Sequence, residues 1–244
     1  MKIAIISGAS SGIGRCIAKE LDLLGLDCLW LIGRNEESLC KLQAELNTDA
    51  KTFALDLTEN DSYEAIKSEL DKGCEIEYLV LSAGVGCNGQ LDSLKSEQIS
   101  NMIDTNCKAL TLLTNTALPY INIGGKILFI ASGAGFLPQP GFSVYAATKS
   151  YTISLSRALR KELKSRKIKV TAACPGPVDT NFFAGLENVP EYKKKYLISP
   201  ERVAKGSLKA VNKGKAIYTP TFSMKAVHLA SKLLPTSLLT SFYK

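Results

Sequence analysis

Short apolar runs alternate with longer stretches of helical spacing along most of this 244-residue chain. The apolar runs, each expected to form a buried strand, are Lys2–Ser7, Asp27–Ile32, Thr52–Leu55, Tyr78–Leu81, Lys126–Ala131, Lys169–Ala173 and the short Ala216–Thr219. The stretches of helical spacing are Gly12–Leu24, Glu36–Leu46, Asp61–Leu70, Ser96–Tyr120, Val144–Arg166 and Pro200–Val211. Strands that alternate with helices of this length form a parallel sheet with helices on both faces. We therefore predict an α/β protein with a doubly wound parallel sheet and one domain over residues 1–244.

The composition is that of a globular protein with a core of its own. Apolar residues make up 45% and charged residues 22% of the chain, which argues against disorder. No apolar run approaches the roughly 18 residues of a membrane span, and the apolar start is too short for a signal peptide. The cysteines form no CxxC pair, so we expect a cytoplasmic protein with free thiols and without a metal site. They are Cys16, Cys28, Cys40, Cys74, Cys87, Cys107 and Cys174.

A glycine-rich segment from Ser7 to Gly14 (SGASSGIG) joins the first expected strand to the first expected helix. Glycine lets the chain turn tightly and lets a pyrophosphate approach the backbone. The helix N-terminus that follows offers free N–H groups and a partial positive charge to the phosphates. The context predicts a nucleotide-binding turn, and the alternative is a tight strand-to-helix turn without a ligand.

The spacing GxxxGxG at Gly8, Gly12 and Gly14, together with the segment from Tyr145 to Lys149 (YAATK), resembles the short-chain dehydrogenase/reductase family. The resemblance covers Lys2 to about Thr180 in matching order. Its further motifs are Asp56, Ser82-Ala83-Gly84, Asn106, Ser132 and Pro175-Gly176. The resemblance implies a Rossmann-like fold, a nicotinamide cofactor and a homodimer or homotetramer formed through the two long helices.

The chain departs from the family pattern in two places. The family often has Asn-Asn-Ala-Gly after the fourth strand, whereas this chain has Leu81-Ser82-Ala83-Gly84. It also lacks the glycine-rich C-terminal ending that is common in the acyl-carrier-protein reductases of the family.

The end of the second expected strand bears on the choice of cofactor. An acid there would accept from the 2′-hydroxyl of NAD, whereas an arginine would pair with the 2′-phosphate of NADP. The chain reads LIGRN from Leu31 to Asn35, so Arg34 predicts NADP(H), with Arg15 as a second candidate cation. The alternative for either arginine is a solvated side chain.

The resemblance extends to the other cofactor contacts. Asp56, with Leu57 beside it, follows the third strand, where the family's equivalent acid contacts the adenine; the alternative for Asp56 is a helix N-cap. Val178 and Thr180 match positions that contact the nicotinamide carboxamide, with a structural turn as the alternative. The complete set expected to bind the cofactor is Gly8, Ser10, Ser11, Gly12, Ile13, Gly14, Arg34, Asp56, Leu57, Ser82, Ala83, Gly84, Tyr145, Lys149, Val178 and Thr180.

Tyr145 and Lys149 share one face of an expected helix, where the ammonium would lower the pKa of the tyrosine. A tyrosine with such a pKa serves as an acid or base near neutral pH. The resemblance implies that Tyr145 protonates a carbonyl oxygen and that Lys149 also binds the nicotinamide ribose. It further implies that Ser132 orients the carbonyl oxygen and that Asn106 bends its helix and holds a water that relays protons to the lysine.

These features predict an NADP(H)-dependent oxidoreductase that interconverts a ketone or aldehyde and an alcohol. The rival interpretation is a catalytically idle NADP-binding regulator or scaffold on the same fold. A substrate lid is expected at about 181–199, where aromatic residues adjoin Lys193-Lys194-Lys195. That mixture suits an apolar substrate such as a fatty acyl, steroid or aromatic carbonyl compound, with or without an anionic group, unless the lysines are simply solvated.

The C-terminal segment, about 222–244, is expected to be amphipathic. Apolar residues at Phe222, Ala226, Leu229, Ala230 and Leu233 share one helical face, and Lys225, His228 and Lys232 are expected on the opposite side. The chain carries +9 from residue 191 onward and −2 before it. The apolar face packs on the body, packs across a dimer, or docks on an anionic membrane. We expect no role in catalysis for this segment, a solvated His228, and no nucleic-acid binding.

Overall fold

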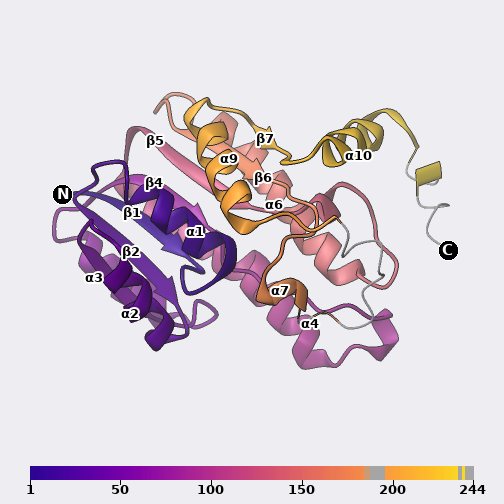
Figure 1. Cartoon of the computed structure of the whole chain (residues 1–244), viewed down its shortest axis with the longest axis horizontal. Coiled ribbons are helices and arrows are strands. Elements are labelled where there is room, and N and C mark those ends of the chain that lie inside the picture. The colour runs from indigo at the N-terminus through magenta and orange to yellow at the C-terminus, as the bar shows by residue number, and fades with distance from the viewer. Residues whose placement is uncertain (185, 187–195, 236–237, 240–244) are drawn as a thin grey trace.

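Seven parallel strands form one sheet in the computed structural model, in the order β3-β2-β1-β4-β5-β6-β7 (Figure 1). The structure describes residues 1–184, 186, 196–235 and 238–239, with the backbone alone for Phe183 and Ala184. The strands are β1 (Lys2–Ser7), β2 (Cys28–Gly33), β3 (Ala50–Ala54), β4 (Glu75–Leu81), β5 (Ile121–Ile130), β6 (Lys169–Ala173) and β7 (Ile217–Tyr218). The order reverses between β1 and β4, and ligands bind at such a switch point, outside the carboxyl ends of the strands.

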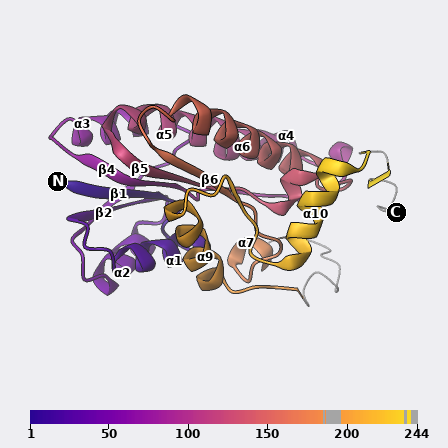
Figure 2. The same cartoon turned by 90° about the horizontal axis from the view of Figure 1, so that it is seen from above.

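Helices cover both faces of the sheet (Figure 2). They are α1 (Gly12–Leu21), α2 (Glu36–Glu45), α3 (Asp61–Leu70), α4 (Ser96–Ile103), α5 (Leu110–Ala117), α6 (Ser143–Glu162), α7 (Asn181–Ala184), α9 (Pro200–Asn212) and α10 (Phe222–Leu233). Figure 2 shows α1, α2 and α9 on one face and α3, α5 and α6 on the other. The predicted α/β fold with a doubly wound parallel sheet is therefore confirmed.

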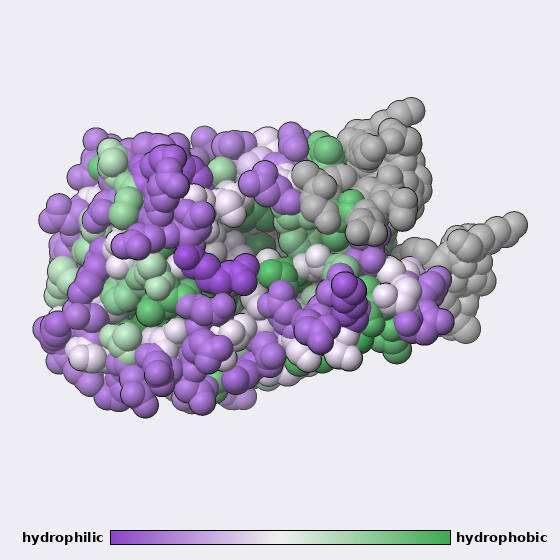
Figure 3. All heavy atoms as spheres, turned by 90° about the horizontal axis from the view of Figure 1, so that it is seen from below, coloured by the Kyte–Doolittle hydropathy of each residue, from purple (hydrophilic) through white to green (hydrophobic). Residues whose placement is uncertain are grey.

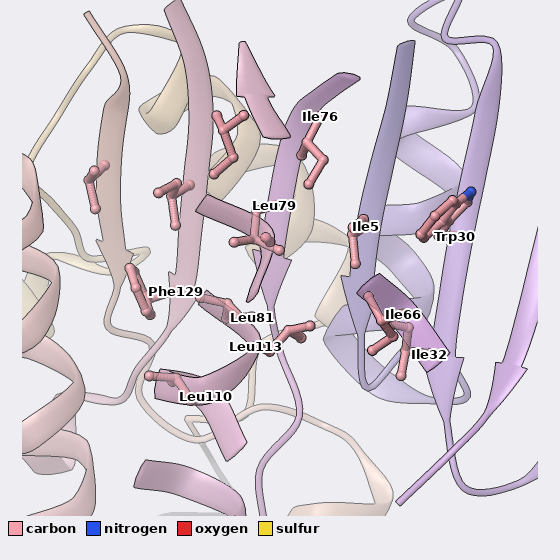
Figure 4. Close-up of a cluster of buried hydrophobic side chains, with 14 of the residues drawn as sticks. Ile5, Trp30, Ile32, Ile66, Ile76, Leu79, Leu81, Leu110, Leu113 and Phe129 are labelled. Atoms are coloured by element: carbon pink, nitrogen blue, oxygen red, sulfur yellow. The ribbon is translucent and has the colours of Figure 1, made fainter. Parts of the chain in front are cut away.

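The strands are apolar throughout because both of their faces are buried. In β1, Ile3 and Ile5 pack toward α3, α5 and α6, whereas Ala4 and Ile6 pack toward α1, α2 and α9. Figure 4 shows the first of these two cores, in which Ile5, Trp30 and Phe129 extend from β1, β2 and β5. Two cores of interlocking side chains fix the positions of the loops at the ends of the strands.

The long helix expected over Ser96–Tyr120 is interrupted. Between α4 and α5 the residues Asp104–Ala109 form a π-helical turn, and Leu118–Tyr120 form a 3₁₀ turn that contains Pro119. Strand β5 then begins at Ile121 rather than at Lys126. The single helix expected over Ser96–Tyr120 is therefore wrong, and the π turn contains Asn106, where the family resemblance implies a bend.

Two helices are shorter than their apolar spacing predicts. Helix α1 ends at Leu21 rather than Leu24, and the carboxylate of its C-cap residue, Asp22, accepts hydrogen bonds from the backbone N–H groups of Asn47 and Thr48 at 2.9 and 2.7 Å. Helix α6 ends at Glu162 rather than Arg166, before a turn in which Lys167 has a φ of 55°. None of the helices in the described part of the chain is both long and apolar enough to cross a membrane.

Candidate active site

A cavity of about 1000 Å³ lies at the carboxyl ends of the strands, bounded by the turn after β1 on one side and by α10 on the other. The structure brings nearly all of the predicted site residues together around it. Those that line it are Gly8, Ser10, Ser11, Gly12, Ile13, Arg34, Asp56, Leu57, Ser82, Ala83, Gly84, Ser132, Tyr145, Lys149, Val178 and Thr180. Gly14 and Asn106 are the two that do not; both are buried beneath the lining.

The glycine turn after β1 is packed so closely that side chains are excluded. Gly8 has a φ of +68°, and a Cβ there would lie 2.8 Å from the backbone nitrogen of Ala83. A Cβ on Gly14 would collide with the carbonyl group of Gly8. Ser7, which sequence reasoning missed, ties the turn to the end of β4, since its Oγ accepts from the N–H groups of Ser82 and Ala83 at 3.1 and 3.2 Å.

The N-terminus of α1 opens into the same cavity without a competing side chain. The N-cap residue, Ser11, forms no side-chain capping bond, and the first turn of the helix contains no acid. Its backbone N–H groups and partial positive charge therefore suit the phosphates of a dinucleotide. The free N-terminus of α1 and the closely packed glycine turn therefore fit the diphosphate of a nicotinamide cofactor.

Arg34 lines the cavity at the end of β2, and its charge helps to hold the pKa of Asp56 below its usual value. The larger cause of that shift is a hydrogen bond from the Thr58 N–H to Asp56 Oδ1, at 2.9 Å. The N-cap alternative for Asp56 is wrong, because α3 begins at Asp61 and Asn60 occupies its N-cap position.

Arg15 is placed differently from Arg34. Its guanidinium lies 2.5 Å from Glu45, which also pairs with Lys19 at 2.7 Å. Arg15 lines a smaller hollow next to Ser10 and Ser11 rather than the main cavity. Of the two candidate cations, Arg34 alone faces the main cavity, because the carboxylate of α2 holds Arg15 aside.

Ser132, Tyr145 and Lys149 meet at the centre of the cavity. Ser132 follows β5, and its hydroxyl is hydrogen-bonded to the Tyr145 side chain and accepts from the Ala134 N–H at 3.1 Å. Lys149 lies one helical turn after Tyr145 on α6, with its Nζ 5.6 Å from the centroid of the tyrosine ring. The lysine donates to the Ile130 carbonyl at 3.2 Å.

Burial governs the protonation of this pair, and the sequence-based expectation of a lowered tyrosine pKa is wrong. Desolvation raises the pKa of Tyr145 to about 12, with the Ser132 hydrogen bond acting in the opposite direction. Desolvation also lowers the pKa of Lys149 to about 8. The charged form of each group loses water in the same buried surroundings, and this loss is the largest cause of both shifts in pKa. Tyr145 therefore holds its proton at neutral pH.

Asn106 supports the cavity from behind. It lies within the π turn, is 1% exposed, and bonds to both backbone polar groups of Val85: Oδ1 accepts from its N–H at 2.9 Å, and Nδ2 donates to its carbonyl at 2.8 Å. Nδ2 also donates to the Thr148 hydroxyl at 3.0 Å. These bonds fix the segment after β4 against α6, and the π turn coincides with Asn106, where the family resemblance implies a bend.

The loop after β6 carries Val178 and Thr180 into the cavity. Val178 bridges to Ile198, and the Asp179 N–H donates to the Ile198 carbonyl at 3.0 Å, so the far end of the expected lid returns to this loop. Phe182 on α7 lies 5.4 Å from the Tyr145 ring, centroid to centroid. Leu186, Tyr196 and Leu197 of the expected lid also line the cavity, whereas residues 187–195, including Tyr192 and the three lysines from 193 to 195, fall outside the described residues.

The end of the cavity beyond Tyr145 is apolar. Phe142 stacks on Tyr145 with ring centroids 4.3 Å apart, and Leu137, Val85 and Met224 add to the lining. Along the described part of the cavity wall the only charged residues are Arg34, Asp56 and Lys149, none of which belongs to this end. The space-filling view in Figure 3 shows apolar residues gathered in a hollow on one face of the molecule.

Sequence reasoning missed this apolar wall and the contribution of the C-terminal helix to it. The spacing of Phe142 and Tyr145 on either side of a helix start is a weak signal for the stacked pair. Met224 and Val227 line the cavity from α10, a contact that the sequence pattern did not indicate, whereas the expectation of no role in catalysis for this segment stays a prediction. His228 is only partly solvated, because its ring stacks on Phe136 at 4.5 Å, and the partial burial lowers its pKa.

The described residues contain no group of three or more His, Cys, Asp or Glu side chains placed to hold a metal ion. The described cysteines are free, and burial raises the pKa of the Cys174 thiol to about 12. The site is therefore built from an alcohol, a phenol, an ammonium and backbone N–H groups.

Comparison with known proteins agrees with this arrangement. The family model described as short chain dehydrogenase matches residues 2–190. A protein of Staphylococcus epidermidis, described as an uncharacterized oxidoreductase, is 36% identical over 189 residues, which are 76% of this chain and 82% of the relative. A short-chain dehydrogenase from Sphingobium yanoikuyae, solved in complex with NADPH, is 26% identical with a TM-score of 0.81 over 98% of this chain and 96% of its own.

A second solved structure is similar to this chain in fold, at an identity too low to indicate more than the fold. It is a short-chain dehydrogenase/reductase from Burkholderia phymatum in complex with NAD, 22% identical with a TM-score of 0.82 over 95% of this chain and 93% of its own. The proteins with this architecture thus include one solved with NADPH and one solved with NAD. From its fold, its motifs and its relatives, the chain belongs to the short-chain dehydrogenase/reductase family of oxidoreductases.

Proposed function

We propose that the protein is an NADP(H)-dependent oxidoreductase that interconverts an apolar ketone or aldehyde and the corresponding alcohol. The observation that carries this proposal is the Ser132–Tyr145–Lys149 set. It lies in a cavity that is lined on the cofactor side by the glycine turn and Arg34 and beyond Tyr145 by apolar side chains. A protein that only binds the cofactor has no need of a buried phenol held by a serine hydroxyl. The rival idle regulator is therefore less well supported.

The roles of the side chains follow from their surroundings. The nicotinamide, when bound, supplies the hydride that reduces the carbonyl carbon. Tyr145, whose pKa of about 12 keeps it protonated, donates its phenolic proton to the carbonyl oxygen, and the Ser132 hydroxyl donates a hydrogen bond to the same oxygen. Lys149 supplies a positive charge below its pKa of about 8. In the direction of alcohol oxidation the same proton returns to the tyrosine.

The choice of NADP(H) rests on Arg34. No acid follows β2 until Glu36, and none of the ion pairs among the described residues occupies the Arg34 guanidinium. A planar, permanent charge with paired donors suits the 2′-phosphate of NADP. The bulky, uncharged lining beyond Tyr145 favours an apolar substrate, with the rings of Phe142 and Phe182 against the ring of Tyr145.

The test is to incubate the protein with NADPH and a panel of aliphatic, aromatic and polycyclic carbonyl compounds. Turnover is measured as the decrease in NADPH absorbance. Tyr145→Phe should lower kcat by at least about 100-fold because only the proton donor is lost. NADPH should still bind to this variant with wild-type affinity.

Tyr151→Phe is the matched control. Tyr151 lies on the same helix, is exposed, and contacts Thr111 rather than the cavity, so its loss should leave turnover unchanged. If the wild type binds NADPH tightly but converts no compound in the panel, the interpretation as an idle regulator is favoured. A Tyr145→Phe variant with wild-type kcat would show that another group supplies the proton.

A further inference from the structure

Helix α10 is attached to the body by one face only. Met224 fits against Gly133 and Gly176, and a Cβ on Gly133 would lie 2.5 Å from the Met224 sulfur. His228 stacks on Phe136, with Arg157 Nη2 3.4 Å from its Nε2. These contacts fix how the helix is rotated about its axis, and Figure 2 shows α10 at the end of the sheet where the strands finish.

The opposite face of α10 is apolar and exposed. Phe222, Leu229 and Leu233 are 84%, 58% and 71% exposed, and they fall on one line because their offsets are 0, 7 and 11 residues. Leu234 and Leu238 continue this exposed surface beyond the helix. We call these five residues the outer stripe. Within the described part of the chain, these exposed fractions contradict the explanation that the apolar face packs on the body of the same chain.

Positive charge borders the outer stripe. Lys225 and Lys232 are exposed and lie about 70° to one side of it, rather than opposite to it, at about 100° per residue. No aspartate or glutamate follows Glu201 in the sequence. A helix whose apolar face is flanked by lysines and free of acids matches an interface between hydrocarbon and anionic headgroups.

The helical part of the outer stripe is by itself too small to hold two copies of the chain together. The helix has 12 residues, so it is about 18 Å long, and an apolar face of about 10 Å width covers about 200 Å². A stable protein–protein interface buries about 800 Å² on each partner. A lipid surface makes no such demand, because each inserted side chain contributes by the area that it buries.

The outer stripe is continuous with the cavity. Phe222 belongs to both, since it lines the cavity and is also the most exposed large apolar residue described, and Met224 and Val227 lead inward from it. We propose that the outer stripe of α10 docks the protein on an anionic phospholipid surface, with Lys225 and Lys232 against the headgroups and the apolar mouth of the cavity toward the bilayer.

Sedimentation of the full-length protein with vesicles tests this proposal without any enzymatic readout, so its outcome is independent of the proposed function. The wild type should sediment with vesicles of equal parts phosphatidylcholine and phosphatidylglycerol at low salt. Binding should weaken at high salt and on pure phosphatidylcholine, because the lysine contribution is screened or lost.

Two double variants probe the two parts of the surface. Leu229→Ser with Leu233→Ser, and Lys225→Glu with Lys232→Glu, should each lower the partition coefficient by at least about tenfold. The controls are Leu23→Ser with Ile123→Ser, which are 74% and 78% exposed elsewhere, and Lys205→Glu with Lys209→Glu on α9, which makes the same change in charge. Both controls should stay within about twofold of the wild type.

The proposal fails if the wild type does not sediment with anionic vesicles at low salt, or if the leucine variant binds them as the wild type does. Light scattering of the same variants tests the alternative that a second copy of the chain covers the outer stripe. If Leu229→Ser with Leu233→Ser reduces the molecular mass of the protein in solution, the outer stripe is covered by a second copy of the chain instead.

Discussion

At the scale of the residue, the central feature is a lysine and a tyrosine buried together without a carboxylate. Lys149 is 5% and Tyr145 6% exposed. Because neither group has an anionic partner, burial favours the neutral form of each. The neutral phenol is the form that can donate a proton, so burial keeps Tyr145 at neutral pH in the form that the proposed carbonyl reduction requires.

The protonation of Lys149 predicts how reduction depends on pH. Below about pH 8 the lysine is charged and Tyr145, with a pKa of about 12, is protonated, so kcat/KM for carbonyl reduction should be flat. Above this value the lysine loses its proton, and kcat/KM should fall about tenfold for each pH unit. The measurement is a pH–rate profile, with Lys149→Arg as comparison, because a guanidinium stays charged throughout the range.

A wild-type profile that stays flat to pH 10 would contradict this assignment. If Lys149→Arg retains measurable turnover, its profile should lack the decline above pH 8. A decline that is identical in both proteins would place the titrating group elsewhere.

Arg34 carries the prediction on cofactor choice. The wild type should bind NADPH at least about tenfold more tightly than NADH, a difference of about 1.4 kcal/mol. Arg34→Asp should narrow or invert this ratio, because the carboxylate repels the 2′-phosphate and accepts from the 2′-hydroxyl of NADH. Binding is measured by fluorescence titration with each cofactor.

Arg202→Asp is the control for that change in charge, since Arg202 is exposed on α9 and does not line the cavity. It should leave the ratio of the two affinities unchanged. Equal affinity of the wild type for NADPH and NADH would contradict the role given to Arg34.

At the scale of the element, the π turn at Asp104–Ala109 links two parts of the site. It aims Asn106 at the backbone of Val85 on one side and at Thr148 of α6 on the other. Thr148 in turn donates to the Tyr145 carbonyl at 2.8 Å. The loop after β4 and the helix that carries Tyr145 are therefore held by one side chain. π turns of this kind occur frequently at functional sites.

Asn106→Leu is predicted to lower the free energy of unfolding by about 2–5 kcal/mol, because it leaves the partly buried N–H and carbonyl of Val85 unpaired. NADPH binding should weaken as well, since Ser82, Ala83 and Gly84 lose their support next to the cavity. Denaturant unfolding and cofactor titration measure the two effects.

Asn101→Leu, an exposed position earlier on the same helical stretch, is the control and should change stability by less than about 0.5 kcal/mol. If the two variants unfold at the same denaturant concentration, the bonds of Asn106 do not stabilise the fold.

At the scale of the whole molecule, the cavity and the hydrophobic cores occupy different parts of the sheet. The two cores fill the space on either face of the strands, and the carboxyl ends of the strands carry the loops that form the cavity. The turn after β1, the end of β4 and the loop after β6 come from distant parts of the chain, yet they meet because parallel strands finish at one edge. Helix α10 extends this edge and places an apolar surface beside the cavity mouth.

Much of this architecture was predictable because it is written in local patterns. The strands β1 and β6 and the helix α3 match their predicted bounds, and the parallel sheet follows from apolar runs that are buried on both faces. The site motifs were also visible, because a glycine-rich turn and a Tyr–Lys pair one helical turn apart have recognisable spacing. These features depend on residues close together in the chain.

The tertiary structure alone decided the properties that depend on distant neighbours. The raised pKa of Tyr145 results from burial by α7, Phe142 and the strands, which no spacing along α6 reports. Glu45, thirty residues away in sequence, holds Arg15 aside from the cavity. The rotation of α10 was likewise set by Gly133, Phe136 and Arg157 rather than by its own amphipathic pattern. A helix carries two faces in its sequence, but only the surface against which it packs determines which of them meets solvent.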